Sequence, residues 1–278
     1  MRLARFPSKG GYEIFAGHDS GWLSLSRLEG GDAPLRMADL LSASRRREIA
    51  ALLDSRSDVE PADVLLEHAA TIVDAGDIWG AGLNYRGHSQ DLNTQQPSSG
   101  PGSYLRPGNC LIGNGQPIEL PSQSRRVTAE AELGLVIGTE CKNVRRDEWR
   151  SVVVGVTAVL DMTAEDVIRE NPRYIPWAKG FDTFCSVGPQ LVTLDEFDDT
   201  ALRAIQVSTV RNGEVVSSAP VSDMKYDPGY LVEYFTAGRT FTPGTVICTG
   251  TPGAAVINSG DSITSVVDGV GTLSHTVK

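Results

Sequence analysis

The 278-residue chain contains only four cysteines, no excess of positive charge and no long apolar run. The cysteines, Cys110, Cys141, Cys185 and Cys248, are far apart and form no CxxC pair, so they indicate no zinc site. The net charge of −10 opposes binding to nucleic acid or to an anionic membrane. No stretch is apolar enough to span a membrane, and the first residues lack the apolar segment of a signal peptide. We therefore expect a cytoplasmic protein with reduced thiols.

Three common motifs are also missing. Gly80-Ala81-Gly82 is followed by Tyr85 at the position where the dinucleotide-binding fingerprint requires a third glycine. The chain has no GxxxxGK(S/T) phosphate loop and no GxSxG nucleophile elbow. The sequence therefore gives no reason to expect a dinucleotide, a P-loop nucleotide or a serine nucleophile of that type.

Glycine and proline are abundant, with 29 and 15 residues, and most apolar runs are short, which favours sheets over helix bundles. We expect an α+β fold that is mainly β. Residues 1–72 have the pattern of a small N-terminal α/β domain, and 73–278 form the main, catalytic domain. In the N-terminal domain, strands are expected at 3–6, 12–16 and 22–25, and helices at 37–53 and 62–70.

In the main domain, strands are expected at 132–137, 152–160, 190–193, 205–211, 245–248 and 262–267, and helices at 164–170 and 228–237. Thr163 has the position of a helix N-cap. The polar segment from about 86 to 106, rich in glycine, serine and proline, is longer than an ordinary connection. We expect this segment to be a lid that is mobile without ligand.

Three acids stand next to apolar runs. Glu130 and Glu132 are two residues apart, so in a strand they share one face and either bind a cation or face solvent. Asp161 follows the run 152–160 and is either a ligand at a strand end or a turn residue. Three converging carboxylates would repel one another by roughly 4 kcal/mol per pair at about 4 Å and an effective dielectric of about 20. Such a cluster needs a cation or protons, and an all-oxygen set favours Mg²⁺, Mn²⁺ or Ca²⁺ over zinc.

Three other segments carry candidate chemistry. His88 and Asp91 are three residues apart, so one helical turn would let the carboxylate orient the imidazole as a base, although a solvated loop histidine fits as well. Lys179 lies among aromatic residues and glycine, and either holds an anionic oxygen or is a surface lysine. The turn Thr249–Gly253 either presents N–H groups and hydroxyls to an oxyanion or is only a turn.

Several short sequence motifs follow one another from about Ile78 to the end of the chain. They are Gly82–Tyr85 with His88, Leu111–Gly113, Pro117–Pro121, Glu130–Leu133, Asp161–Ala164 with Asp166, Lys179–Phe184, Asn212–Glu214, Thr249–Gly253 and Gly269–Leu273. In these motifs and in their order, the sequence resembles the fumarylacetoacetate hydrolase superfamily from about Ile78 to the end of the chain. The resemblance implies a mixed β-sheet roll, usually a homodimer.

The resemblance also implies roles for single residues. Mg²⁺ or Mn²⁺ would be bound by Glu130, Glu132 and Asp161, and Ca²⁺ could replace it in a crystal. A lid-borne histidine and glutamate would activate water. His88 matches this pair, whereas Asp91 is one methylene shorter than the usual glutamate. Lys179 would steady the oxygens of the substrate, and the residues expected to contact the substrate are Tyr85, Arg106 and Thr251.

The superfamily divides by reaction, and kinship of fold does not choose among the reactions. We expect a metal-dependent hydrolase that cleaves a C–C bond in a small 2,4-dioxo acid such as an acylpyruvate or fumarylpyruvate. One alternative is a decarboxylase or tautomerase of an oxaloacetate-like 2-oxo dicarboxylate. Another is a metal-binding paralogue without turnover, in which Asp91 marks a decayed lid. The expected partner is a 2-oxo acid, with no role for nucleic acid or membrane.

Overall fold

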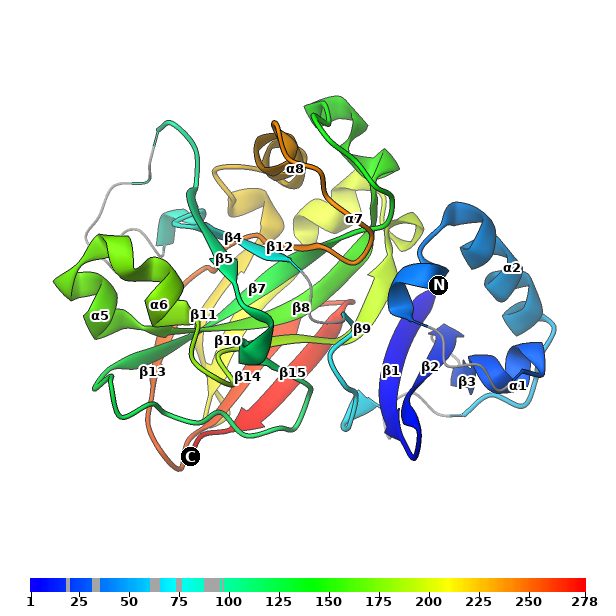
Figure 1. Ribbon diagram of the computed structural model, residues 1–278, viewed down its shortest axis with the longest axis horizontal. Coiled ribbons are helices and arrows are strands. Elements are labelled where there is room, and N and C mark those ends of the chain that lie inside the picture. Colours follow the sequence, from blue (N-terminus) through cyan, green and yellow to red (C-terminus); the bar gives the residue numbers. More distant parts are fainter. Residues whose placement is uncertain (19–20, 32–35, 61–65, 74–76, 88–95, 97) are drawn as a thin grey trace.

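The computed structural model describes residues 1–18, 21–31, 36–60, 66–73, 77–87, 96 and 98–278. The chain forms an 11-stranded mixed sheet and a 4-stranded antiparallel sheet (Figure 1). The expectation of an α+β fold that is mainly β is confirmed. Within the described ranges, no helix has the length and hydropathy needed to cross a membrane.

The large sheet has the order β3-β2-β1-β9-β8-β7-β12-β4-β5, with β6 paired to β9 and β13 paired to β7. Its strands are β1 (Arg2–Ser8), β2 (Gly11–His18), β3 (Gly21–Ser24), β4 (Ile78–Gly82), β5 (Gly102–Arg106), β6 (Leu111–Ile112), β7 (Val127–Ile137), β8 (Val153–Ala164), β9 (Cys185–Thr193), β12 (Val246–Cys248) and β13 (Ala254–Ile257). The small sheet has the order β11-β10-β14-β15 and consists of β10 (Gln206–Arg211), β11 (Glu214–Pro220), β14 (Ser262–Val267) and β15 (Gly271–Thr276).

Short helices connect and cover the sheets. The α-helices are α1 (Leu25–Glu29), α2 (Ala43–Asp54), α5 (Glu165–Glu170), α6 (Ile175–Lys179), α7 (Asp199–Ala204) and α8 (Pro228–Thr236). The 3-10 turns are η1 (Met37–Leu40), η2 (Gly108–Cys110), η3 (Arg146–Ser151), η4 (Pro172–Tyr174), η5 (Leu194–Glu196) and η6 (Val221–Asp223).

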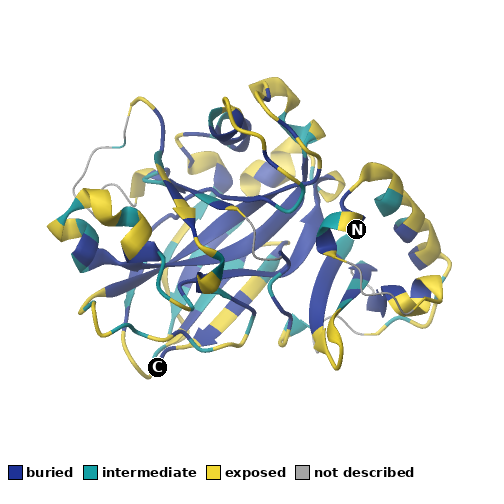
Figure 2. Ribbon diagram, viewed as in Figure 1, coloured by how far each residue is buried: buried dark blue, intermediate teal, exposed yellow. Residues whose placement is uncertain are grey.

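The core lies along β7 and β8, whose residues are all buried (Figure 2). The two strands pair antiparallel over their whole length, and β10 and β14 of the small sheet pack against β7. Polar contacts join the two sheets: Ser265 donates to the carbonyl of Val159 at 2.9 Å, and the amide of Ala131 donates to Thr209 at 3.0 Å. A polar side chain on β7 or β8 is therefore shielded from bulk water and needs a partner within the protein or a ligand.

The N-terminal residues do not have a sheet of their own. β1, β2 and β3 form at the expected strands, and β1 pairs with β9, so they extend the large sheet. The expected helix at 37–53 is broken into η1 and α2, because Ser42 caps α2 with its hydroxyl, which accepts from the amide of Arg45 at 3.3 Å. Residues 62–65 of the helix expected at 62–70 lie outside the described residues, and residues 67–70 form a turn and irregular structure instead of a helix.

Two expectations around the site are wrong. Thr163 is not an N-cap, because β8 continues to Ala164 and α5 begins without a side-chain cap. For the same reason Asp161 lies inside β8 and does not follow its end. The segment expected as a lid ends in β5, which pairs with β4, so its last five residues belong to the large sheet. Most of the remaining lid segment lies outside the described residues.

Candidate active site

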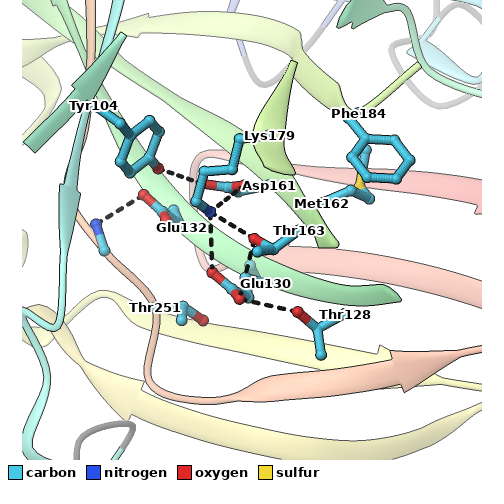
Figure 3. Close-up of polar contacts among 12 residues, drawn as sticks. Tyr104, Thr128, Glu130, Glu132, Asp161, Met162, Thr163, Lys179, Phe184 and Thr251 are labelled. Atoms are coloured by element: carbon cyan, nitrogen blue, oxygen red, sulfur yellow. Dashed lines mark hydrogen bonds and ion pairs between the residues drawn. The ribbon is translucent and has the colours of Figure 1, made fainter. Parts of the chain in front are cut away.

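Three carboxylates converge on one face of the β7–β8 ladder. Glu130 is paired directly with Asp161, and Glu132 lies two residues further along β7, so the pleat turns all three side chains to the same face. One carboxylate oxygen from each residue lies within 4.8 Å of the others (Figure 3). The register of two long strands therefore brings together the three acids singled out in the sequence.

Asp161 is the most enclosed of the three, with no exposed surface. The hydroxyl of Tyr104 donates to its Oδ2, while Arg106 and the Nζ of Lys179, at 2.7 Å, donate to its Oδ1. Burial by itself raises the pKa of Asp161, but the positive charges of Arg106 and Lys179 outweigh burial and hold the pKa below its usual value. Asp161 is therefore an ionised carboxylate in the protein interior.

Glu132 is in the opposite electrostatic situation. The amide of Gly250 donates to its Oε2 at 2.7 Å, but burial and then the negative charge of Asp161 raise the pKa of Glu132 well above its usual value. Glu130 accepts hydrogen bonds from Thr128 at 3.2 Å and from Thr163 at 3.5 Å. The charge of Lys179 and the amide of Gly250 favour the charged form of Glu132, but burial and Asp161 outweigh them.

Lys179 lies at the end of α6 and reaches into the cluster. Its Nζ donates to Thr163 at 2.6 Å and lies 3.7 Å from an oxygen of Glu130. Burial lowers the pKa of Lys179, but Asp161 and Glu130 outweigh burial and raise it. Lys179 therefore contributes a buried ammonium group beside the three acids.

The three acids fit a divalent cation. An oxygen from each residue would lie about 2.0–2.5 Å from a common centre, a geometry in which the oxygens are less than about 5 Å apart. The observed spread of 4.8 Å meets this requirement. The three acids outnumber the two buried cations beside them, Lys179 and Arg106, so full ionisation of the acids would leave one negative charge uncompensated. The donor set consists of carboxylates only, which are the ligands preferred by hard divalent ions.

The comparisons with known proteins agree with this geometry. Residues 77–278 match the family described as fumarylacetoacetate (FAA) hydrolase, C-terminal. The chain belongs to the fumarylacetoacetate hydrolase family. It is 30% identical over 263 residues to a maleylpyruvate hydrolase of Aquipseudomonas alcaligenes, covering 90% of this chain and 87% of that protein.

Other members of the fumarylacetoacetate hydrolase family match as well. A mitochondrial oxaloacetate tautomerase of Xenopus laevis is 32% identical over 205 residues, covering 70% of this chain and 63% of that protein. The crystal structure of a maleylpyruvate hydrolase from Sphingobium sp. SYK-6, in complex with manganese(II) and pyruvate, is 30% identical with a TM-score of 0.81. The match covers 100% of this chain and 98% of that one.

The residues expected to contact substrate have different surroundings. Arg106 is buried and donates to Asp161 and to the carbonyls of Lys179, Phe184 and Met162, so all these contacts are within the protein. The hydroxyl of Thr251 donates to the carbonyl of Gly253 at 3.0 Å, within its own turn. Their predicted contacts with substrate stay predictions.

Tyr85 is 1% exposed, and in the described part of the chain its hydroxyl has no hydrogen-bond partner. Burial and the charges of Glu132 and Asp223 raise the pKa of Tyr85. His88 and Asp91 lie outside the described residues. Their predicted role as a water-activating pair therefore stays a prediction.

Sequence reasoning missed Tyr104 and the role of Thr163. A signal for Tyr104 was present, because it stands two residues before Arg106 and a strand would turn both side chains to one face. The turn Thr249–Gly253 was expected either to present N–H groups to an oxyanion or to be only a turn, and the amide of Gly250 in this turn donates to Glu132. In this fumarylacetoacetate hydrolase family member, β5 therefore supplies two donors that fix Asp161.

Proposed function

We propose that the chain is a divalent-metal-dependent hydrolase that cleaves a C–C bond in a small 2,4-dioxo acid, with Mg²⁺ or Mn²⁺ as its ion. The observation that carries the proposal is the convergence of Glu130, Glu132 and Asp161 beside the buried ammonium of Lys179. The similarity to two maleylpyruvate hydrolases, which extends over nearly the whole chain, supports this reaction.

Each residue of the cluster would have a separate role in the reaction. A bound divalent ion supplies Lewis-acid stabilisation for the carboxylate and 2-oxo oxygens of the substrate. Glu130, Glu132 and Asp161 would hold the ion, and Arg106 would keep Asp161 ionised and in place. The ammonium of Lys179 would stabilise negative charge that develops on a substrate oxygen.

The hydrolytic step needs a base and a nucleophilic water. We assign the base to His88, oriented by Asp91, as the family resemblance implies. The water oxygen forms a bond to the C4 carbonyl carbon, and its proton passes to His88. The C3–C4 bond breaks, its electron pair leaves with the pyruvate enolate, and protonation of that enolate gives pyruvate. The products are one pyruvate and one carboxylic acid.

A substrate panel tests the proposal. The purified protein, with Mg²⁺ or Mn²⁺, would be incubated with acylpyruvates, fumarylpyruvate, maleylpyruvate and oxaloacetate, and the products identified by NMR. We expect pyruvate and the matching acid from at least one 2,4-dioxo acid, with turnover lost after chelation and restored by either ion. Unchanged 2,4-dioxo acids throughout would contradict the proposal, and no change in any compound would favour the paralogue without turnover.

A tautomerase is the second candidate, because the chain is similar to an oxaloacetate tautomerase and a metal-stabilised enolate serves that reaction too. It would interconvert keto and enol oxaloacetate without cleaving a 2,4-dioxo acid. Faster enol–keto exchange of oxaloacetate in the same panel, without C–C cleavage of the other compounds, would favour this candidate over the hydrolase.

A further inference from the structure

Two of the cysteines, Cys110 and Cys185, are far apart in the sequence but adjacent in the fold. Cys110 ends the η2 turn, and the next residue, Leu111, is the register partner of Cys185 in the parallel β6–β9 pair. Paired strands are about 4.8 Å apart and each residue advances a strand by about 3.3 Å, so a displacement of one residue puts the two Cα atoms roughly 6 Å apart. Disulfides span Cα–Cα distances of about 4.4–6.8 Å. The backbone therefore places the two cysteines at a spacing that a disulfide can bridge.

The two thiol groups also interact directly. A hydrogen bond with the thiol of Cys185 is the strongest influence on the pKa of Cys110, and it lowers this pKa. Burial opposes the shift and the charge of Arg106 adds to it, so the pKa of Cys110 lies at about 7. The thiolate is the nucleophilic form of cysteine, and a pKa near neutrality makes it abundant. Cys110 is therefore a reactive sulfur with a second thiol in contact with it.

Arg106 adds a buried positive charge beside the pair. Its terminal nitrogens donate to Asp161 and to three backbone carbonyls, whereas its Nε has no hydrogen-bond partner within the described residues. A buried N–H of a charged group is costly without an acceptor. Negative charge on the sulfur of Cys110 compensates this guanidinium, and the guanidinium stabilises the thiolate in return.

A short turn covers the pair. Cys110 and Cys185 are fully buried, while Pro107 and Asn109, which precede Cys110, are exposed. The turn is closed by a backbone hydrogen bond of 3.3 Å from the amide of Cys110 to Pro107, and the side chain of Asn109 donates to Asp182 at 2.7 Å. Such a turn opens at a lower cost in free energy than unfolding of the whole protein, and its opening admits a small molecule to Cys110.

We infer that Cys110 and Cys185 are a peroxide-sensitive modification site that closes to a reversible disulfide, in which Cys110 reacts first and Cys185 resolves the product. The oxidant is a small hydroperoxide such as hydrogen peroxide. The pair would form this disulfide whatever reaction the carboxylate cluster catalyses.

The oxidation has two steps. The sulfur of Cys110 attacks one oxygen of hydrogen peroxide, the O–O bond breaks, and the other oxygen leaves as water after taking up the thiol proton of Cys110. The sulfur of Cys185 then attacks the resulting sulfenic acid, the S–O bond breaks, and the hydroxyl leaves as water with the thiol proton of Cys185. The two thiols together lose two electrons, and the peroxide gains them.

Peptide mapping of the wild-type protein tests the pair directly. The reduced protein would be treated with hydrogen peroxide at neutral pH, its remaining thiols blocked with N-ethylmaleimide, and its peptides compared by mass spectrometry with and without reduction. We expect loss of two of the four free thiols, a disulfide that joins Cys110 to Cys185, and recovery of both thiols with dithiothreitol. Cys141 should stay reduced, although at 8% exposure it is the most accessible cysteine.

Single variants test the order of the two steps. Cys185→Ser should stop the reaction at a sulfenic acid on Cys110, which dimedone traps, because the resolving thiol is missing; Cys185→Ala is a second replacement that adds no buried hydroxyl. Cys110→Ser should consume peroxide at least about tenfold more slowly than the wild type, since an ordinary cysteine is only a few per cent thiolate at neutral pH. The matched control Cys141→Ser should form the disulfide as the wild type does. Melting temperatures of the reduced proteins would show that each variant folds.

Each of four results would overturn the inference. The first is a wild type that keeps all its thiols at a peroxide concentration that oxidises free cysteine. The second is a disulfide that joins a different pair of cysteines or two separate chains. The third is irreversible oxidation of Cys110 to a sulfinic acid in the wild type. The fourth is the absence of a dimedone adduct on Cys110 in both folded Cys185 variants. All four results leave the proposed function standing.

Discussion

At the scale of single residues, the site is defined by which acids have a cationic partner. Asp161 receives three side-chain donors, from Tyr104, Arg106 and Lys179, and remains ionised. Glu132 receives one backbone amide and is opposed by the charge of Asp161. A divalent ion would remove this imbalance, so we assign Glu132 as the ligand on which metal affinity depends most strongly.

The substitution Glu132→Gln tests this assignment. An amide oxygen can still accept from Gly250, but the buried negative charge is gone. We expect Mn²⁺ affinity to fall at least about 100-fold, since even loss of a group behind a ligand costs about 10–100-fold. The melting temperature of the metal-free protein should rise, because a buried repulsion is relieved. Calorimetry and thermal unfolding measure both, with exposed Glu140→Gln as the control, and unchanged Mn²⁺ affinity would refute the assignment.

The substitution Arg106→Met tests the buried ion pair with Asp161. Removing one partner of such a pair leaves an uncompensated charge, so we expect unfolding free energy to fall by about 3–5 kcal/mol. The control is Arg145→Met, which removes an exposed pair with Asp147 and should cost at most about 1 kcal/mol. Urea unfolding gives both values. A similar small loss in the two variants would mean that Arg106 does not stabilise Asp161.

Whether a site residue could be identified from the sequence depends on how that residue acts. Glu130, Glu132 and Lys179 belong to recognisable motifs. The alternation of side chains along a strand already placed Glu130 and Glu132 on the same face of their strand. That Asp161 joins them depends on the β7–β8 register, which spacing alone does not give. Arg106 was expected at the substrate, yet its contacts are with Asp161 and carbonyl groups, because a buried cation is drawn to a buried anion.

At the scale of elements, the site depends on how closely β4 and β5 approach each other. Gly80 of β4 is paired with Tyr104 of β5, and a Cβ on Gly80 would lie 1.9 Å from the Tyr104 ring. The absence of a side chain at Gly80 therefore allows the ring to lie across the strand and reach Asp161.

The substitution Gly80→Ala should displace the Tyr104 ring and its bond to Asp161. We expect a loss of about 1–3 kcal/mol in unfolding free energy, the usual cost of overpacking, together with weaker Mn²⁺ binding. Gly82→Ala, in the same strand, is the control, because its Cβ would meet the nearest atom at 3.7 Å, an ordinary contact. Equal stability of the two variants would show that the ring does not need the space at Gly80.

The elements themselves were largely predictable from apolar runs and turn residues. The β7, β8, β10, β12 and β14 strands and the α8 helix occur where the patterns indicated. The errors lie at boundaries: β8 extends past Asp161 because pairing with β7 continues to Val127, and β5 begins within the expected lid. Both depend on a partner strand that is distant in sequence, and a local pattern carries no information about such a partner.

At the scale of the whole molecule, a buried histidine joins the small sheet to the rest of the chain. His275 of β15 is 3% exposed and its Nδ1 lies 2.7 Å from the carbonyl of Gln116. Within the described residues its Nε2 has no partner, and burial lowers the pKa of His275 below its usual 6.5. The folded state thus disfavours the imidazolium.

Stability should therefore fall as the pH falls below about 6.5. In that range the unfolded chain binds a proton at this position and the folded chain does not, so the histidine costs up to about 1.4 kcal/mol per pH unit until its folded pKa is reached. Between pH 7.5 and pH 5.5, the melting temperature of His275→Gln should fall less than that of the wild type. The melting temperature of the control His68→Gln, at an exposed position, should fall as much as that of the wild type. An identical loss in all three proteins would contradict this.

The central claim is that the carboxylate cluster supports metal-dependent hydrolysis of a C–C bond, and oxygen-18 labelling tests it most directly. Purified protein with Mn²⁺ would be incubated with an acylpyruvate and with maleylpyruvate in H₂¹⁸O, and the products analysed by mass spectrometry. Hydrolysis predicts one ¹⁸O atom in the carboxylic acid released from the acyl half, and no cleavage after chelation. Intact substrate in the presence of Mn²⁺, or cleavage that persists after exhaustive chelation, would contradict the claim.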